Sequence, residues 1–570
     1  MLTLTQAYFR DTAAMSTSLA QSIHDPALRP KVPAKVLSAT AVLAVVNTLT
    51  RMMSFLMVPL YAHFLRPAEF GLVDLFQVST FLMGMLVSFQ MPGGLMRYLQ
   101  SPERLQAELG NTTSPGQNPE LISSADVFSN GLMLILAGNA AFAVLGSLLL
   151  PFVAGFWPAL AVMQPYWTTF LLFLLGYTLL EYGKQLCRSQ QLVKSVVMGE
   201  VLQTGLLIAL NVVLVVGLHW GMSGFLASLI ISQMVVLGYF IWQGRWHTLF
   251  NGVGKMTGAW LGLSIKPLVM KRLLAFSIPL IPAVVSLMLM GYIDRILVVS
   301  LRGLDEAGLY AIGLKIAMIL SFFNQAFHQS ASMYLFNETD EDTVEAEADP
   351  IACASEVIPG KHQRAISAEK LQTLQHLFHV QWSMCLVLST LSLLFIKPVF
   401  ALTLPQGFYQ SWVVIPFVLV WSTAYGVSSF LSMGLMIQEK TITIMVINAA
   451  SLALNIGLCL WMIPLWGMVG AAAASALSFI TMTLVMRWLV RHTLPVSLPP
   501  RLWLASVVFA GMIALFYVDV PMTSPALWPW LGGMGLGAVG LCLLCLPDLS
   551  GFMSIALNKI RALTQGPQAS

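Results

Sequence analysis

Between residues 271 and 336, four ionisable side chains lie within apolar runs, at depths where lipid should exclude them. Asp294 and Arg295 are neighbours in the first part of this stretch, and Lys315 and His328 follow in its second part. Charges inside a membrane are costly, and they usually pair with one another or line a water-filled path. An Arg can bind an oxyanion through two parallel hydrogen bonds, whereas a Lys offers a point charge. These residues therefore indicate a buried polar site that could bind an anionic group.

Asp294 and Arg295 cannot neutralise each other within one helix. Adjacent helical positions point about 100° apart and do not face each other. At least one of the two side chains must therefore face another helix, where we expect Lys315 or Arg51 as its partner. Arg51 lies near the middle of the first long apolar run. A structural salt bridge or a gate between helices is the alternative to a binding site for these residues.

Three further charged residues, as well as His328, lie near the ends of apolar runs. Arg97 could meet an anion at the cytoplasmic mouth, although anchoring at the membrane edge is the alternative. Asp74 and Glu181 could carry a proton if burial favours their neutral form, whereas solvated or paired interface residues would look the same. His328 is a candidate proton relay or, alternatively, a hydrogen-bonded packing residue.

The sequence predicts no metal site. Cys542 and Cys545 form a CxxC inside an apolar run, but no second ligand pair lies nearby. His376 and His379 share a helix face and fit polar residues at a membrane edge. The acidic run at 338–349 fits a disordered cytoplasmic loop.

The elements that hold these residues must be membrane-spanning helices. Hydrophobic residues make up 57% of the 570-residue chain and charged residues only 9%, whereas a soluble domain carries about 25% charged residues. About 14 apolar runs approach the length of about 20 residues that a span needs. They lie near 36–65, 70–99, 128–155, 166–187, 194–218, 221–243, 273–300, 307–336, 376–402, 411–436, 441–463, 467–490, 502–519 and 527–547. We therefore predict an all-α, polytopic membrane protein.

The basic residues predict the orientation of these runs. If the amino terminus is cytoplasmic, 23 of the 29 Lys and Arg lie in inner segments, as the positive-inside rule requires. Both termini are then cytoplasmic. Three of the other six lie in outer loops: Arg66, Arg302 and Lys397. The remaining three lie within apolar runs: Arg51, Arg295 and Lys315.

Short motifs recur about 240 residues apart, which indicates an internal repeat. The residues 65–72 recur at 301–309, 209–211 at 453–455, and 220–224 at 466–470. The repeat predicts two bundles of about six helices, related by a pseudo-two-fold axis along the membrane normal. The expected organisation is a cytoplasmic segment (1–35), a first bundle (36–243), a linker (244–271), a second bundle (272–490) with an acidic loop (337–370), an accessory helix pair (501–547) and a cytoplasmic tail (548–570).

Four sequence motifs, together with an Arg in the first apolar run, resemble those of a known family. They are LRPAEFG at 65–71, FSIPLIPA at 276–283, GYIDRILV at 291–298 and LDEAGLYA at 304–311. Over residues 36–495 the chain resembles the Wzx-type polysaccharide-biosynthesis flippases of the multidrug/oligosaccharidyl-lipid/polysaccharide (MOP) exporter superfamily. The resemblance implies transport of undecaprenyl-diphosphate-linked oligosaccharides from the inner to the outer leaflet of the bacterial inner membrane.

Such a task requires a hydrated cavity, because each unpaired polar group in hydrocarbon costs several kcal/mol. The diphosphate also needs cationic partners there. We assign two groups of residues on this basis. The group that would bind the diphosphate and glycan comprises Arg51, Arg295, Lys315 and Arg97. The group that would couple or gate transport comprises Asp294, Asp74, Glu181 and His328.

The chain has no P-loop, HExxH or Ser-His-Asp context, so we expect neither an enzyme nor a resident cofactor. The energy would come from an ion gradient, with proton or sodium as the candidate coupling ion, or from the substrate's own gradient. Expected partners are the lipid-linked oligosaccharide, membrane lipids and polysaccharide polymerase machinery, with no nucleic acid. A cation-coupled multidrug exporter of the same superfamily is the second hypothesis, and a membrane glycan polymerase or ligase is the third.

Overall fold

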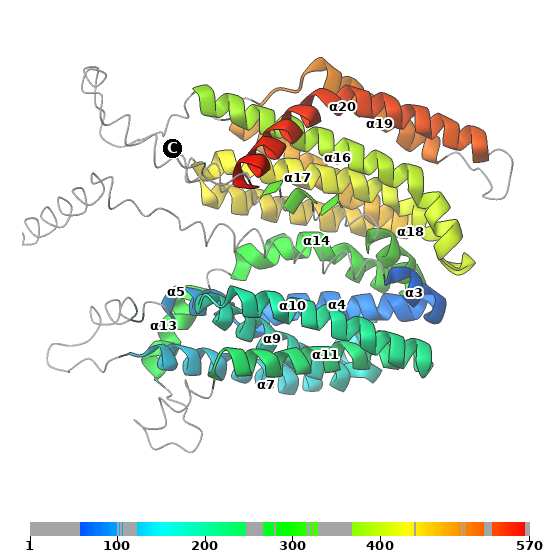
Figure 1. Ribbon diagram of the computed structural model, residues 1–570. Coiled ribbons are helices and arrows are strands. Elements are labelled where there is room, and N and C mark those ends of the chain that lie inside the picture. The colour runs from blue at the N-terminus through cyan, green and yellow to red at the C-terminus, as the bar shows by residue number, and fades with distance from the viewer. Residues whose placement is uncertain are drawn as a thin grey trace, which may run out of the picture. The chain divides into compact units, whose positions relative to one another are not determined.

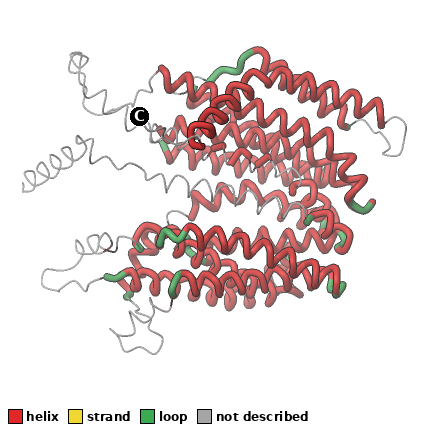
Figure 2. Tube along the Cα trace, in the orientation of Figure 1, coloured by secondary structure: helices red, strands yellow, loops and turns green. Residues whose placement is uncertain are grey.

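A computed structural model describes residues 57–99, 102, 105, 122–246, 266–278, 281–315, 320–321, 323–325, 327–328, 368–437, 440–491, 494, 496–517 and 527–564. Arg51, the segment 1–35 and the acidic run at 338–349 lie outside these ranges. Within them, every regular element is a helix (Figure 2). Nine of these described helices are long and apolar enough to cross a membrane, and shorter helices lie between them. The prediction of an all-α polytopic protein is confirmed.

The first half of the chain forms helices that are shown from blue to green in Figure 1. Short turns join most of them, so consecutive helices pack as neighbours. They are α3 (Val58–Phe64), α4 (Pro67–Val87), α5 (Met91–Tyr98), α7 (Ser124–Ala154), α8 (Pro158–Met163), the 3-10 turn η1 (Gln164–Tyr166), α9 (Trp167–Ser189), α10 (Val193–Asn211), the π-helical turn η2 (Val212–Gly217) and α11 (Gly221–Gln243).

The second half begins with α13 and adds a pair of helices at its end, shown in orange and red in Figure 1. A helix without a label occupies 304–315. The others are α13 (Pro267–Ser277), α14 (Ile281–Arg302), α16 (Ala368–Thr403), the 3-10 segment η4 (Gln406–Val414), α17 (Ile415–Ile437), α18 (Thr441–Val490), α19 (Pro500–Phe516) and α20 (Leu527–Thr564).

The apolar run at 70–99 forms two helices rather than one. Phe89 and Gln90 adopt positive φ angles of 49° and 53°, and Pro92 lies in the first turn of α5. A proline lacks the N–H that a helix interior requires, so it favours a new helix start. Close by, α7 approaches so tightly that a Cβ on Gly138 would lie 2.1 Å from the Val87 carbonyl oxygen.

The predicted break between the runs at 441–463 and 467–490 is present inside α18. Gly467 follows Pro464 and adopts a φ of +58° and a ψ of −136°, outside the helical region. In the first half, Gly221 occupies the same Trp-Gly turn with a φ of +54°. Positive φ favours glycine, so the repeated motif specifies the same turn twice.

Each half also contains a buried hydrogen bond between an asparagine and a serine. Asn211 accepts a hydrogen bond from Ser228 Oγ at 2.9 Å and donates to Tyr61 Oη at 3.2 Å. In the second half, Asn455 donates to Ser475 Oγ at 3.2 Å. Both asparagines are fully buried. A buried polar group left unpaired costs about 1–3 kcal/mol, so these pairs fix how the helices of each half pack.

The two halves meet through a reciprocal contact between repeated residues. A Cβ on Gly71 would lie 2.3 Å from the Leu304 carbonyl oxygen, and one on Gly308 would lie closer still to the carbonyl oxygen of Pro67. Position 67 corresponds to 304 in the repeat, and 71 corresponds to 308. Equivalent residues that exchange equivalent contacts are the mark of a two-fold relation. The predicted pseudo-two-fold therefore passes between these glycines.

Four turns gather beside this glycine contact, and we call them the turn end: residues 65–67, 217–221, 302–304 and 464–467. Glu306 accepts a hydrogen bond from Met468 N at 2.6 Å, directly over Gly467. Arg302 donates to the carbonyl oxygens of Ile463 and Pro464 at 3.1 and 2.8 Å. In the first half, the Phe64 and His219 rings lie 6.2 Å apart. The turn end is thus tightly packed.

The accessory pair α19 and α20 packs on α16. A Cβ on Gly537 would lie 3.0 Å from Met512 Sδ, so the GxxxG sequence at 533–537 permits close packing here. Asp548 is buried and accepts a hydrogen bond from Arg501 at 2.6 Å. This ion pair lies beyond residue 547, where the apolar run ends, and α20 continues to Thr564.

The count of basic residues assigns Lys397 to an outer loop, but Lys397 lies inside α16. Its Nζ donates to the Phe516 carbonyl oxygen at 2.7 Å, and the rings of Trp412, Phe516 and Trp530 lie within 4.4–4.8 Å of it. The cation therefore binds the carboxyl end of α19, where helix carbonyl groups lack partners.

Candidate substrate and coupling site

An ion pair joins the two halves along α4 and α14. Arg295 Nη1 lies 3.5 Å from both carboxylate oxygens of Asp74. The two residues are 7% and 4% exposed. The guanidinium also stacks on Tyr292, 5.0 Å from the ring centroid, and Tyr292 in turn stacks on Phe81 of α4. We call this line of contact between α4 and α14 the seam.

The helical repeat explains why α4 presents these residues together. Positions three or four apart share one helix face. Gly71, Asp74 and Phe81 therefore lie on a common face of α4, and all three contact the second half. On α14, Tyr292 and Arg295 are likewise three apart.

Arg295 is not saturated by its ion pair. Charge-assisted hydrogen bonds are usually about 2.7–2.9 Å long, and 3.5 Å is loose by that measure. Its Nε is buried and has no hydrogen-bond partner among the described residues. The guanidinium therefore retains capacity to bind an oxyanion.

Lys315 lies near the same pair, on the helix at 304–315. Its Nζ is 4.6 Å from the centre of the Phe70 ring on α4. It is half-buried and interacts electrostatically with both Asp74 and Arg295. Two cations and one carboxylate thus meet at the seam.

Asp294 faces away from the seam, into the second half. It accepts hydrogen bonds from Tyr310 Oη at 2.5 Å and from Ser475 Oγ at 3.2 Å. Ser475 Oγ in turn accepts a hydrogen bond from Asn455, whose side-chain oxygen Oδ1 accepts one from Cys459 Sγ at 3.6 Å. The expectation that Asp294 and Arg295 point in different directions is therefore met. We had proposed Lys315 or Arg51 as the partner, whereas Arg295 pairs with Asp74.

Three candidates lie apart from this group. Glu181 belongs to a second ion-pair cluster, in which Lys184 Nζ lies 2.8 Å from Glu181 and 3.0 Å from Glu200. Arg97 is exposed at the end of α5, with its guanidinium carbon 4.5 Å from the Phe276 ring centroid. His328 has a buried Nδ1 without a partner in the described part of the chain.

Sequence reasoning missed three members of the Asp294 cluster: Tyr310, Ser475 and Asn455. Asn455 carried a signal, because it belongs to a motif repeated at 209–211. Ser475 and Tyr310 carried none, since hydroxyl side chains are common in apolar helices and often bond their own backbone. Arg51 lies outside the described residues, so its position relative to the seam is a prediction.

Two solved structures share this architecture. The lipid II flippase MurJ, in an inward closed conformation, matches with a TM-score of 0.58 at 11% identity, over 90% of this chain and 99% of that one. An inward-facing multidrug resistance MATE family transporter of the MOP superfamily matches with a TM-score of 0.52 at 11% identity, over 79% of this chain and 100% of that one. No curated protein sequence matches the chain.

The fold is therefore that of the flippases and transporters of the MOP superfamily, in a multi-pass membrane protein. Residues 36–333, more than half of the chain, match the family model described as polysaccharide biosynthesis protein. The chain belongs to this polysaccharide biosynthesis family.

Proposed function

We propose that the chain moves undecaprenyl-diphosphate-linked oligosaccharides from the inner to the outer leaflet of the bacterial inner membrane. The family places it in polysaccharide biosynthesis, and the fold is one that flippases and transporters use. In this proposal both termini are cytoplasmic and the turn end faces outward. The product would pass to polysaccharide polymerase machinery.

The observation that carries the proposal is the incompletely bonded Arg295 at the seam. Its Nε is unpartnered and its contact to Asp74 is loose, while Lys315 lies beside it. A diphosphate presents several oxyanions and would bind such a pair of cations more closely than Asp74 does. Its arrival would release Asp74 and weaken the contact between the halves. Substrate binding would thus be linked to their relative movement, as alternating access requires.

Asp294 is the proposed coupling group. A buried carboxylate surrounded by hydroxyl and amide oxygens can exchange a proton or hold a cation such as sodium. Because Asp294 and Arg295 are adjacent on α14, a change in the charge of one alters the field at the other. Ion binding in the second half would thereby reach the seam directly.

The rival functions fit this site less well. A multidrug exporter for cationic compounds would require an acidic or aromatic cavity, whereas the seam carries two cations against one carboxylate. A glycan polymerase or ligase would be an enzyme, whereas the solved structures that share this fold are named as a flippase and a transporter.

The test is headgroup translocation in proteoliposomes that contain the full chain. The substrate is a fluorescent oligosaccharide on polyprenyl diphosphate, and the readout is its accessibility to an impermeant quencher. We expect translocation by the wild type, loss in Arg295→Gln, and no change in Lys440→Gln, which removes an exposed cation. Equal rates in empty and protein-containing liposomes would refute the proposal. Efflux of cationic dyes without headgroup movement would favour the exporter.

A further inference from the structure

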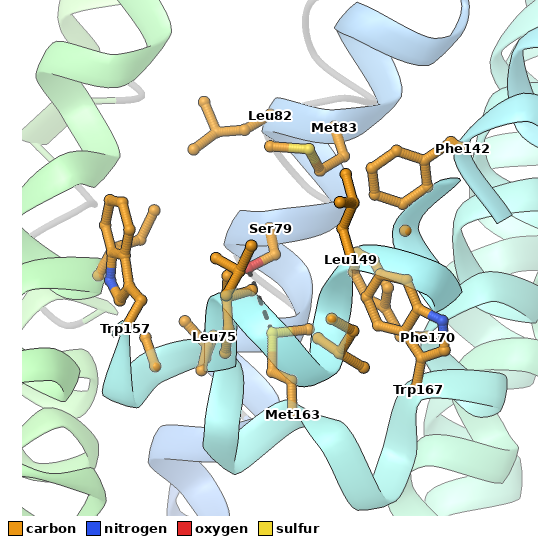
Figure 3. Close-up of a pocket in the computed structure, with 16 residues that line it drawn as sticks. Leu75, Ser79, Leu82, Met83, Phe142, Leu149, Trp157, Met163, Trp167 and Phe170 are labelled. Atoms are coloured by element: carbon orange, nitrogen blue, oxygen red, sulfur yellow. Dashed lines mark hydrogen bonds between the residues drawn. The ribbon is translucent and has the colours of Figure 1, made fainter. Parts of the chain in front are cut away.

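An apolar cavity of about 300 Å³ lies beside the seam (Figure 3). Its walls come from α4, α7, α8, α9 and α14, together with Trp157 before α8. Ser79 is the one hydroxyl side chain among its lining residues, and its Oγ contacts Met163 Sδ at 3.8 Å. The indole N–H groups of Trp157 and Trp167 donate to Ser300 and Ser147. The cavity therefore offers no free polar group to hold water, and an apolar cavity of this kind binds apolar molecules.

The mouth of the cavity opens on the apolar face of α7. Leu149 and Trp157 line it and are 55% and 42% exposed. Next to them on α7, Leu148 and Phe152 are 63% and 73% exposed. Because α7 is a candidate span, this exposed apolar face lies against bilayer hydrocarbon. A hydrocarbon chain can therefore enter from the bilayer without crossing water.

The inner wall of the cavity is the seam itself. Leu75 on α4 and Ile296 on α14 line the cavity, and their neighbours Asp74 and Arg295 form the ion pair. One residue further along a helix turns the side chain by about 100°. The cavity and the ion pair thus occupy adjacent faces of the same two helices. A molecule with an anionic end at Arg295 and an apolar end in the cavity matches both.

We propose that this cavity holds the first isoprene units of the substrate tail while the diphosphate binds Arg295. The proposal rests on the proposed function and adds where the tail leaves the protein. Opening of the Asp74–Arg295 contact would join the cavity to the space between the halves. The tail would then remain in hydrocarbon while the headgroup passes between the halves. The hydrogen bond from Trp157 to Ser300 links α8 to α14 at the same opening.

Photo-crosslinking of the full chain in phosphatidylglycerol nanodiscs tests the proposal. One probe is polyprenyl diphosphate with a diazirine on its first isoprene units, and the other is phosphatidylglycerol with a diazirine in an acyl chain. We expect the prenyl probe to label peptides that contain Leu149 or Met163. Excess unlabelled polyprenyl diphosphate should remove this labelling, and excess phosphatidylglycerol should not.

A matched pair of variants tests the space itself. Ser79→Phe fills the cavity, whereas Ser79→Ala leaves it open. Because each buried methylene contributes to binding, loss of about two of them corresponds to roughly tenfold weaker labelling in Ser79→Phe. We expect wild-type labelling in Ser79→Ala. The competition experiment needs no variant, so it decides the matter even if Ser79→Phe fails to fold.

Three results would overturn the inference: equal labelling of the cavity by both probes, prenyl labelling that competitor leaves unchanged, or labelling confined to other helices. Headgroup translocation is measured separately, with the same purified protein in proteoliposomes. Translocation without cavity labelling would leave the proposed function in place and refute the tail site. Cavity labelling without translocation would support the tail site and refute the flippase.

Discussion

Gly71 and Gly308 pack backbone against backbone across the two halves. A Cβ on Gly71 would lie 2.8 Å from Gly308 N, and one on Gly308 would lie 3.1 Å from Gly71 N. A Cβ on either glycine would also overlap a backbone carbonyl oxygen of the other half, Leu304 O or Pro67 O, so any other residue must separate the helices. The closed turn end therefore depends on this pair.

We first predict that Gly308→Ala shifts the protein toward conformations with a separated turn end. Spin labels at Trp220→Cys and Trp466→Cys, both exposed turn residues in opposite halves, report the separation. Double electron–electron resonance should show a population with a longer distance. Gly291→Ala is the control, because a Cβ there meets nothing within 4 Å. An unchanged distance distribution in Gly308→Ala would contradict the prediction.

The second prediction concerns the stability of the ion pair at the seam. Asp74→Asn and Arg295→Gln each remove one partner of the buried ion pair beside Lys315, and breaking a buried pair in this way costs about 3–5 kcal/mol. The double variant leaves neither charge and should recover most of that loss. Thermal unfolding in detergent measures all three variants.

Translocation separates the two roles of Arg295. If Arg295 binds diphosphate, the double variant remains inactive although it is stable. Recovery of translocation together with stability would mean that the pair is purely structural.

The third prediction is that Asp294→Asn abolishes the response of translocation to an ion gradient. The amide retains hydrogen bonds to Tyr310 and Ser475 but loses the charge. Translocation should be measured with and without imposed proton and sodium gradients. Ser475→Ala, which removes one of two hydroxyl partners, should weaken the response without abolishing it. An undiminished response in Asp294→Asn would exclude Asp294 as the coupling group.

The fourth prediction is that the Glu181 cluster is structural. Lys184→Met leaves the half-buried Glu181 and Glu200 without their cation, so the free energy of unfolding should fall, but by less than the roughly 3–5 kcal/mol that a fully buried pair would cost. Glu181→Gln keeps the Lys184–Glu200 pair and should cost much less. Neither variant should alter the gradient response of the protein that remains folded. A changed response in Glu181→Gln would return Glu181 to the coupling groups.

The fifth prediction concerns Lys397 and the accessory pair. Lys397→Met removes the charged hydrogen bond to Phe516, worth about 1.5–3 kcal/mol. The end of α19 and the neighbouring α20 should then loosen, which exposes the buried Cys545. Maleimide labelling of Cys545 at graded temperature measures this, and Cys187, buried in the first half, serves as the internal control. Parallel labelling of both cysteines would indicate global unfolding instead.

Sequence reasoning was sufficient for the fold class and for local geometry. The composition indicated that the helices lie in a membrane, and helical periodicity indicated that the side chains of Asp294 and Arg295 point in different directions. The repeated Trp-Gly motif marked a turn that only glycine favours. These features depend on residues close together in the chain, which is why they can be derived without a structure.

Contacts between distant helices were harder to predict. The Asp74–Arg295 pair joins helices from different halves, and periodicity indicates a face but not its neighbour. Lys397 was placed outside because hydropathy counts a lysine as exposed, whereas three aromatic rings from other segments surround it. The α4–α5 break had one local signal, Pro92, within a run that is otherwise apolar.

The buried Asn–Ser bonds inside each half bear on how the protein can move. Asn211 and Ser228 join α10 to α11 in the first half, and Asn455 and Ser475 join the two parts of α18 in the second, so we expect each half to move as one rigid unit. The glycine contact at the turn end is then the pivot between the two units. A small rotation about this pivot displaces the opposite ends of the two halves by a much larger distance.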